Sequence, residues 1–221
     1  MPDRVMLILG INTVADACGA ALVRDGAVLA ELSEPMNQGH DARLAPVVEQ
    51  LMRETGIAFG ELDRIAVIVG PGSFTGVRVG VAFARGLSLA LEIAAVGVTS
   101  LEAIDGLPSR GYVLGLLPAR RRPPHRTWWG QLIDAGRGGA EPFEAGDDEL
   151  TARAAGTDAV CGGLDDLPGL GQRQIAGAPS ARAAALFAAR MAAHDLPPPR
   201  PVYVREPDAT PMHKPVPLAG Q

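Results

Sequence analysis

The sequence has few of the features that mark secreted, membrane or disulfide-bonded proteins. Only two cysteines, Cys18 and Cys161, occur among its 221 residues, and they lie far apart in the chain. No apolar run reaches the roughly 20 residues that a membrane-spanning helix requires, and no secretory signal is evident. We therefore expect a cytoplasmic protein with reduced, buried thiols and no contact with a membrane.

The motifs of several enzyme classes are also missing. Residues 70–78 are rich in glycine but do not end in the Gly-Lys-Ser/Thr of a Walker phosphate loop. The chain has no Gly-x-Ser-x-Gly elbow. Its four histidines, His40, His125, His194 and His213, are isolated and form no His-x-x-x-His pair. We assign no metal site and no catalytic residue, while a hydrolase whose residues meet only in space stays open.

The composition restricts the partners of the chain. Its formal net charge is -5 and its pI is about 5.4, with 47% hydrophobic residues. This hydrophobic content is enough for the core of one large domain or two small ones. The acidic balance argues against broad electrostatic binding of nucleic acid. Any contact with nucleic acid must therefore be local or shared with another protein.

Strand and helix patterns alternate along the first part of the chain. Apolar runs bounded by turn residues predict strands, and Asp25-Gly26 predicts a hairpin. An apolar period of three to four residues predicts amphipathic helices. The predicted strands are 5–11, 18–23, 28–32, 64–69 and 94–98, and the predicted helices are 41–55 and 73–91. This order is typical of an α/β protein with a mixed sheet flanked by helices.

The remaining sequence predicts a second, smaller half. Its predicted strands are 112–117, 128–133 and 158–161, and its predicted helices are 147–155 and 180–195. The prolines at 197–199 end the last helix. We divide the chain into an N-terminal half, 1–105, a smaller C-terminal half, 106–209, and a tail, 210–221, whose composition predicts no fixed structure.

The helix predicted at 73–91 carries a strip of small residues. Its members recur at every fourth position on one side of the helix: Gly76, Gly80, Ala84 and Ser88. A glycine inside a helix costs about 1 kcal/mol relative to alanine, so this strip indicates close packing against another backbone. That backbone belongs either to a partner or to this chain. We interpret the preceding glycine turn as a structural link, ahead of an anion site.

The helix predicted at 41–55 has one clear apolar face. Pro46 lies near its start, where a missing amide is tolerated best, and Gly56 is a natural stop. We interpret His40, just before the helix, as a capping or solvent-facing residue. The apolar face is formed by Leu44, Val47, Val48, Leu51 and Met52.

Five blocks of the sequence resemble the TsaB (YeaZ) family, in family order from end to end. They are 7–13 (LILGINT), 39–46 (GHDARLAP), 70–80 (GPGSFTGVRVG), 96–103 (VGVTSLEA) and 201–205 (PVYVR). Members of this family partner TsaD in making threonylcarbamoyladenosine beside the tRNA anticodon. The resemblance implies an actin-like, sugar-kinase-like fold of two ribonuclease-H-like halves, in which this chain is a non-catalytic scaffold.

The resemblance also implies partners. Helices 41–55 and 73–91 would pair with helices of TsaD in a bundle. TsaE would join the complex, tRNA would be reached through it, and ATP and a metal ion are expected on TsaD, with no cofactor assigned to this chain. Self-association as a homodimer without TsaD stays open. We assign the TsaD contact to Leu44, Val48, Leu51, Gly76, Gly80, Ala84 and Ser88.

The first departure from the family lies after the first strand. Active members of the wider superfamily carry an aspartate there, which positions a metal-bound water near the phosphates of a nucleotide. Here that position resembles Asn12. Because a neutral amide is no base and binds magnesium weakly, we expect no ATPase. Asn12 and Thr13 are candidates for residual nucleotide contact, against the alternative of a loop that hydrogen-bonds its own backbone.

The second departure is the segment 118–126 (PARRRPPHR), where the family usually has a tighter Asp-Ala-Arg-Arg-Gly turn. It is the only dense basic cluster in the chain. Arg120, Arg121 and Arg122 are candidates for a tRNA contact, against the alternative of a solvated loop. Trp128 and Trp129 follow, and because residues alternate faces on a strand, at most one of them stacks on a ligand.

Two functional classes therefore remain. The first is a non-catalytic scaffold for TsaD. The second is an independent enzyme, either an actin-like ATPase or a glycoprotease-type hydrolase. The missing metal ligands and the amide of Asn12 favour the scaffold.

Overall fold

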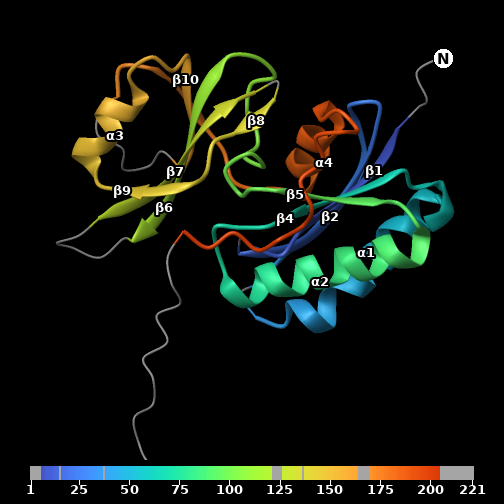
Figure 1. Cartoon of the computed structure of the whole chain (residues 1–221). Coiled ribbons are helices and arrows are strands. Elements are labelled where there is room, and N and C mark those ends of the chain that lie inside the picture. The colour runs from blue at the N-terminus through green and yellow to red at the C-terminus, as the bar shows by residue number, and fades with distance from the viewer. Residues whose placement is uncertain are drawn as a thin grey trace, which may run out of the picture.

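The structure, a computed structural model, describes residues 6–14, 16–36, 38–120, 126–135, 137–163 and 170–204. Two separate sheets form its framework, with three helices on the first sheet and one on the second (Figure 1). The segment 205–221 lies outside the described residues, so the prediction of a tail without fixed structure stays a prediction.

The first sheet is mixed, as predicted, and has the order β3-β2-β1-β4-β5. β1 pairs antiparallel with β2 and parallel with β4, so it lies at the centre with both neighbours hydrogen-bonded. All six residues of β1 are buried, which explains why its sequence is continuously apolar. The strands are β1 (Leu7–Asn12), β2 (Ala17–Arg24), β3 (Ala27–Pro35), β4 (Arg64–Ile68) and β5 (Ala94–Val98).

The second sheet has the order β11-β10-β6-β7-β8, with β9 also paired to β7. Its three predicted strands are present, and three short ones were missed because two to four residues show no usable period. The strands are β6 (Tyr112–Arg120), β7 (Thr127–Asp134), β8 (Gly138–Gly139), β9 (Phe143–Ala145), β10 (Ala159–Gly162) and β11 (Arg173–Ala176). Helix α3 (Asp147–Ala154) packs here through Leu150 and Ala154.

Helices α1 (His40–Thr55) and α2 (Phe74–Leu91) lie side by side on one face of the first sheet (Figure 1). A short 3-10 turn, η1 (Phe59–Glu61), precedes β4. α1 ends at Gly56, as predicted, with φ 68°. His40 differs from expectation, because it is the first residue of α1 and its side chain is buried, not solvent-facing.

Helix α4 (Ala181–Arg190) was predicted with the C-terminal half but packs on the opposite face of the first sheet, against β1, β2 and β4 (Figure 1). Its buried side is almost all alanine, so its backbone approaches β1 at Gly10, where a Cβ would collide with the Ala181 carbonyl. The guanidinium of the buried Arg64 donates to the carbonyls of Ala188 and Met191 and so satisfies the end of the helix. The division at residue 105 itself stays a prediction.

The predicted TsaD contact on α1 and α2 is corrected by the burial of its members. Leu44, Val48 and Leu51 are at most 1% exposed and form part of the core of this chain. A Cβ at Gly76 would collide with the Thr13 carbonyl, and one at Gly80 would collide with the Thr13 hydroxyl. Of the remaining two members, Ala84 is fully buried, and the half-buried Ser88 donates to the Ile93 carbonyl at 2.6 Å. A partner contact by Ser88 stays a prediction.

The second backbone that the small strip requires is therefore internal. It is the loop that follows β1, which α2 approaches along Gly76 and Gly80. The sequence showed that close packing was needed but not which backbone supplied it. The buried side of α2 is therefore occupied by the chain itself.

Two alanine substitutions in the same helix test this correction. We expect Gly76→Ala to lower the free energy of unfolding by about 3 kcal/mol, at the upper end for overpacking, because backbone atoms must move. Gly86→Ala has no atom within 4 Å of the new Cβ. We expect it to raise stability by up to about 1 kcal/mol through helix propensity. Urea unfolding followed by circular dichroism measures both, and equal stabilities would contradict the internal packing.

Candidate functional site

A cleft of about 480 Å³ lies between the two sheets. Its walls come from the loop after β1, the glycine turn after β4, strands β6 and β7, and the segment 177–179. The candidate nucleotide residues Asn12 and Thr13 lie next to this loop in the chain, and the glycine turn forms part of the lining. The residues that the structure describes here decide what the cleft can bind.

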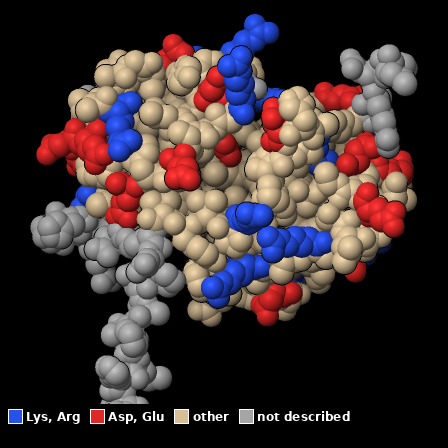
Figure 2. All heavy atoms as spheres, viewed as in Figure 1, with Lys and Arg blue, Asp and Glu red and all other residues tan. Residues whose placement is uncertain are grey.

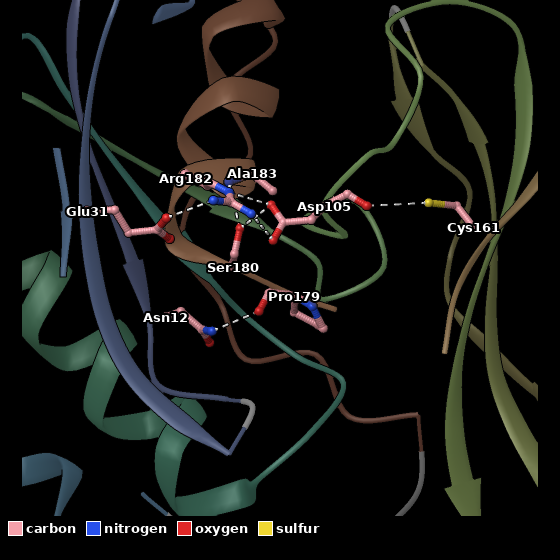
Figure 3. A network of polar contacts seen from close by, with 8 residues as sticks. All are labelled: Asn12, Glu31, Asp105, Cys161, Pro179, Ser180, Arg182 and Ala183. Carbon is pink, nitrogen blue, oxygen red and sulfur yellow. Dashed lines mark hydrogen bonds and ion pairs between the residues drawn. The ribbon is translucent and has the colours of Figure 1, made fainter. Parts of the chain in front are cut away.

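Asn12 ends β1 and is 3% exposed. Its Nδ2 donates to the Pro179 carbonyl at 3.1 Å (Figure 3), and its Oδ1 accepts from the Val14 amide at 3.0 Å. One amide side chain therefore closes its own loop and ties it to the segment before α4. An aspartate would supply only acceptors, so it would lose the bond to Pro179.

Thr13 is fully buried, and its hydroxyl donates to the Gly76 carbonyl at 2.8 Å. Neither Asn12 nor Thr13 lines the cleft. The prediction that these two residues contact a nucleotide therefore does not fit the structure, because their side chains are hydrogen-bonded to the backbone of this chain. The alternative reading, a loop that hydrogen-bonds its own backbone, fits the observed bonds.

The glycine turn at 70–73 also satisfies its own polar groups. The Ser73 amide donates to the Val14 carbonyl at 3.4 Å, and its hydroxyl accepts from the Gly76 amide at 3.2 Å as the cap of α2. The Ser100 amide donates to the Gly70 carbonyl at 2.8 Å. The Ser73 and Gly76 amides are therefore used within the chain, which fits the interpretation of the turn as a structural link.

The cleft offers little to an anion in its described lining. Its single charged residue there is Asp16, which repels phosphate. Within the same described part of the chain, no group of three or more His, Cys, Asp or Glu is placed to hold a metal ion. The described residues therefore do not fit a nucleotide with its magnesium ion.

Both cysteines are buried and unpaired. Burial raises the pKa of the Cys161 thiol to about 11, and burial together with nearby Glu34 raises the pKa of the Cys18 thiol to about 11. Both thiols are consequently protonated at neutral pH. Because the thiolate is the nucleophile, neither cysteine suits covalent catalysis.

A polar cluster at the start of α4 joins this helix to the segment between the two sheets (Figure 3). The Asp105 carboxylate accepts from the Arg182 guanidinium at 2.9 Å and from the Ser180 hydroxyl at 2.7 Å. Arg182 also pairs with Glu31 of β3 at 3.2 Å. These bonds fix the start of α4 against the chain segment that leads into the second sheet.

The two tryptophans occupy opposite faces of β7, as predicted. Trp128 is 2% exposed in the core of the second sheet, and its Nε1 donates to Asp147 Oδ1 at 2.9 Å. Trp129 is half-buried and lines the cleft. Of the candidate tRNA contacts, Arg121 and Arg122 lie outside the described residues and Arg120 ends β6. Their role stays a prediction.

The outward face of α2 carries a second apolar stripe, which the sequence analysis missed. Leu89 is 82% exposed, more than any other large apolar residue among those the structure describes. The apolar and small residues of this stripe recur at a spacing of three and four, which the sequence alone shows. The strip of small residues on the same helix drew the interpretation instead. We call the second stripe the outer stripe; its members are Val79, Ala82, Phe83, Gly86, Leu89 and Ala90.

With stripes on two sides, α2 is long and apolar enough to cross a membrane by length and composition alone. Its inner side, however, is buried: Val77 and Val81 belong to the core beneath the first sheet. Such a helix is a packed element of the fold with one apolar side left uncovered.

Comparisons with known proteins agree with this fold. A family model described as "TsaD: tRNA N6-adenosine threonylcarbamoyltransferase" matches residues 28–105. The TsaB protein of Bacillus subtilis, a "tRNA threonylcarbamoyladenosine biosynthesis protein", is 38% identical over 118 residues. That match covers 52% of each protein, so the chain spans about half the length of this curated relative.

Two further similarities extend over nearly the whole chain. An uncharacterized protein of Mycobacterium tuberculosis is 33% identical over 227 residues, which cover 95% of this chain and 96% of that protein. A Pseudomonas aeruginosa structure, described as similar to peptidase YEAZ, superposes with a TM-score of 0.68 at 25% identity. It covers 90% of this chain and 100% of that one.

These matches agree with the resemblance found in the sequence. The two sheets with their helices form the actin-like, sugar-kinase-like fold of two ribonuclease-H-like halves. The relative called TsaB matches about half of the chain in sequence, and the structure described as similar to YEAZ matches its fold over 90% of the chain. The chain therefore belongs to the TsaB (YeaZ) family.

Proposed function

We propose that this chain is a non-catalytic subunit that binds and supports TsaD during formation of threonylcarbamoyladenosine on tRNA, next to the anticodon. The names of its relatives supply the process. The outer stripe of α2 carries the structural argument, because it is the apolar surface that a partner helix requires.

The outer stripe faces outward because the opposite side of α2 is packed against this chain. Gly76 and Gly80 hold the inner side of α2 on the loop after β1, so the helix cannot turn its apolar residues inward. Leu89, Ala82 and Ala90 are exposed, while Phe83 and Val79 are half-buried against the core. Small residues next to large ones form a surface on which a second helix packs closely.

The proposed partners and cofactors follow from this assignment. ATP and a metal ion belong on TsaD, TsaE joins the complex, and tRNA is held by the assembly in the cytoplasm. A homodimer through the same stripe is the competing state when TsaD is absent. In this account the chain contributes a binding surface and no reacting group.

An independent ATPase or glycoprotease-type hydrolase is the alternative. The peptidase wording attached to one solved relative belongs to that protein. In the described part of this chain, the buried and bonded Asn12 and the lining of the cleft do not favour either activity. We therefore give the alternative no mechanism.

Replacing the most exposed residue of the outer stripe tests the proposed binding surface. We expect Leu89→Gln to weaken TsaD binding at least tenfold, since losing an apolar anchor at an interface costs more than about 1.4 kcal/mol. Folding should not change, because the side chain is 82% exposed. Titration of TsaD by calorimetry measures the affinity, and thermal melting measures the folding.

Leu29→Gln is the matched control. Leu29 is 44% exposed on β3, far in sequence from α2, and the substitution is chemically identical. We expect it to leave TsaD affinity unchanged. If the parent chain binds TsaD and both variants bind equally well, the interface lies away from the outer stripe.

ATP turnover tests the non-catalytic assignment. We expect none above background in the purified chain and none in Asn12→Asp, since one carboxylate without a metal cluster supplies no catalytic site. Asn12→Asp should also lower stability by about 1–3 kcal/mol, because the Pro179 carbonyl loses its donor. Steady-state turnover that survives stringent purification and disappears on substitution of Asn12 or Thr13 would overturn the assignment.

A further inference from the structure

Two sequence motifs without a role in the proposed function meet at the N-terminal end of α2. The Arg78 guanidinium lies over the Phe74 ring, with its Cζ 3.7 Å from the ring centroid. Arg78 Nε donates to the Tyr203 hydroxyl at 3.2 Å. The rings of Phe74 and Tyr203 lie 5.0 Å apart, tilted by 37°. The three side chains therefore form one stacked group of a cation and two aromatic rings.

The backbone that carries Tyr203 is held in place. The segment 197–204, which we call the strap, runs over the first sheet toward α2 (Figure 1). The Gly97 amide donates to the Pro197 carbonyl at 2.9 Å, and the Val202 amide donates to the Val69 carbonyl at 2.8 Å. Tyr203 is nevertheless 43% exposed. A fixed backbone with an exposed ring presents a pre-ordered surface to a ligand.

Positive charge gathers on the same surface. Arg78 and Arg85 are the only charged residues of α2, and they lie seven residues, about 10.5 Å, apart on one side of the helix. The strap adds the exposed Arg200. Figure 2 shows arginine atoms over α2 and the strap, close to one another, while acidic atoms are more common elsewhere on this face.

These arginines differ from Arg43 and Arg182, whose charges are used in ion pairs. Arg43 pairs with Glu34, and Arg182 pairs with Asp105. Within the described residues, Arg85 and Arg200 have no ion-pair partner, and Arg78 contacts only the two rings. The acid nearest to Arg85 in the sequence is Glu92, which shares a groove with it at the other end of α2. Free cations on a chain of net charge -5 leave a local attraction for anions.

We propose that this arginine–tyrosine patch, formed by Phe74, Arg78, Arg85, Arg200 and Tyr203, binds single-stranded RNA. The arginines contact two or three phosphates, and the exposed ring of Tyr203 stacks on a base. The patch lies beside the outer stripe, on the side of α2 that faces the strap, so protein and RNA occupy neighbouring surfaces. Cations beside an exposed aromatic ring are the combination with which proteins bind single-stranded nucleic acid, and this favours RNA.

Fluorescence anisotropy with a short, labelled single-stranded RNA and the full chain, without TsaD, tests the proposal. Three phosphate contacts on a single strand predict that affinity falls about twentyfold between 50 and 200 mM salt. Arg78→Gln/Arg85→Gln/Arg200→Gln should lower affinity at least tenfold at the lower salt concentration and remove most of the salt dependence. Tyr203→Leu should lower affinity about fivefold or more while the salt dependence stays as in the parent.

A matched triple variant controls for total charge. Arg53, Arg137 and Arg173 are exposed on other parts of the chain. Changing all three to glutamine alters the net charge equally and should leave RNA affinity within twofold of the parent. Thermal melting shows that each variant is folded.

Three results would overturn the proposal. In the first, the parent chain binds no RNA at low salt. In the second, the control triple variant loses as much affinity for RNA as the patch variant. In the third, the patch variant keeps its RNA affinity and loses affinity for TsaD, which assigns the arginines to a protein contact. Because RNA is titrated without TsaD, failure here leaves the proposed TsaD binding untouched.

Discussion

The close approach of α2 to the loop after β1 is the constraint on which the rest of the structure depends. Gly76 and Gly80 leave room for Thr13, whose hydroxyl binds the Gly76 carbonyl. This contact sets the rotation of α2 about its own axis. The same rotation buries Val77 and Val81, turns the outer stripe away from the sheet and places the glycine turn at the cleft.

Polar groups near the start of α4 bind distant parts of the chain. Asn12 ties the end of β1 to Pro179, and Asp105 holds Arg182 and Ser180 at the start of α4. These hydrogen bonds hold the start of α4 on the first sheet. On the outside of α2, by contrast, apolar and cationic side chains meet water.

Most of the framework could be predicted from the sequence because its periods are local. Leu44 to Met52 repeat with the helical period, and Asp25-Gly26 marks its hairpin. What could not be predicted is which surfaces meet. Gly76 signals a close backbone without naming it, and the alanines of α4 suit either sheet. The patch joins Arg78 to Tyr203, 125 residues apart, a pairing that only tertiary structure defines.

The position of α4 has a consequence for the order in which the chain folds during synthesis. Asn12 and Pro179 lie 167 residues apart in the sequence, and Arg64 reaches the Ala188 carbonyl across 124 residues. The first sheet therefore lacks the cover of one face until α4 has left the ribosome. Until then β1 presents an apolar surface to the cell, and contacts of such long range close slowly. The nascent chain is consequently most exposed to aggregation before α4 emerges.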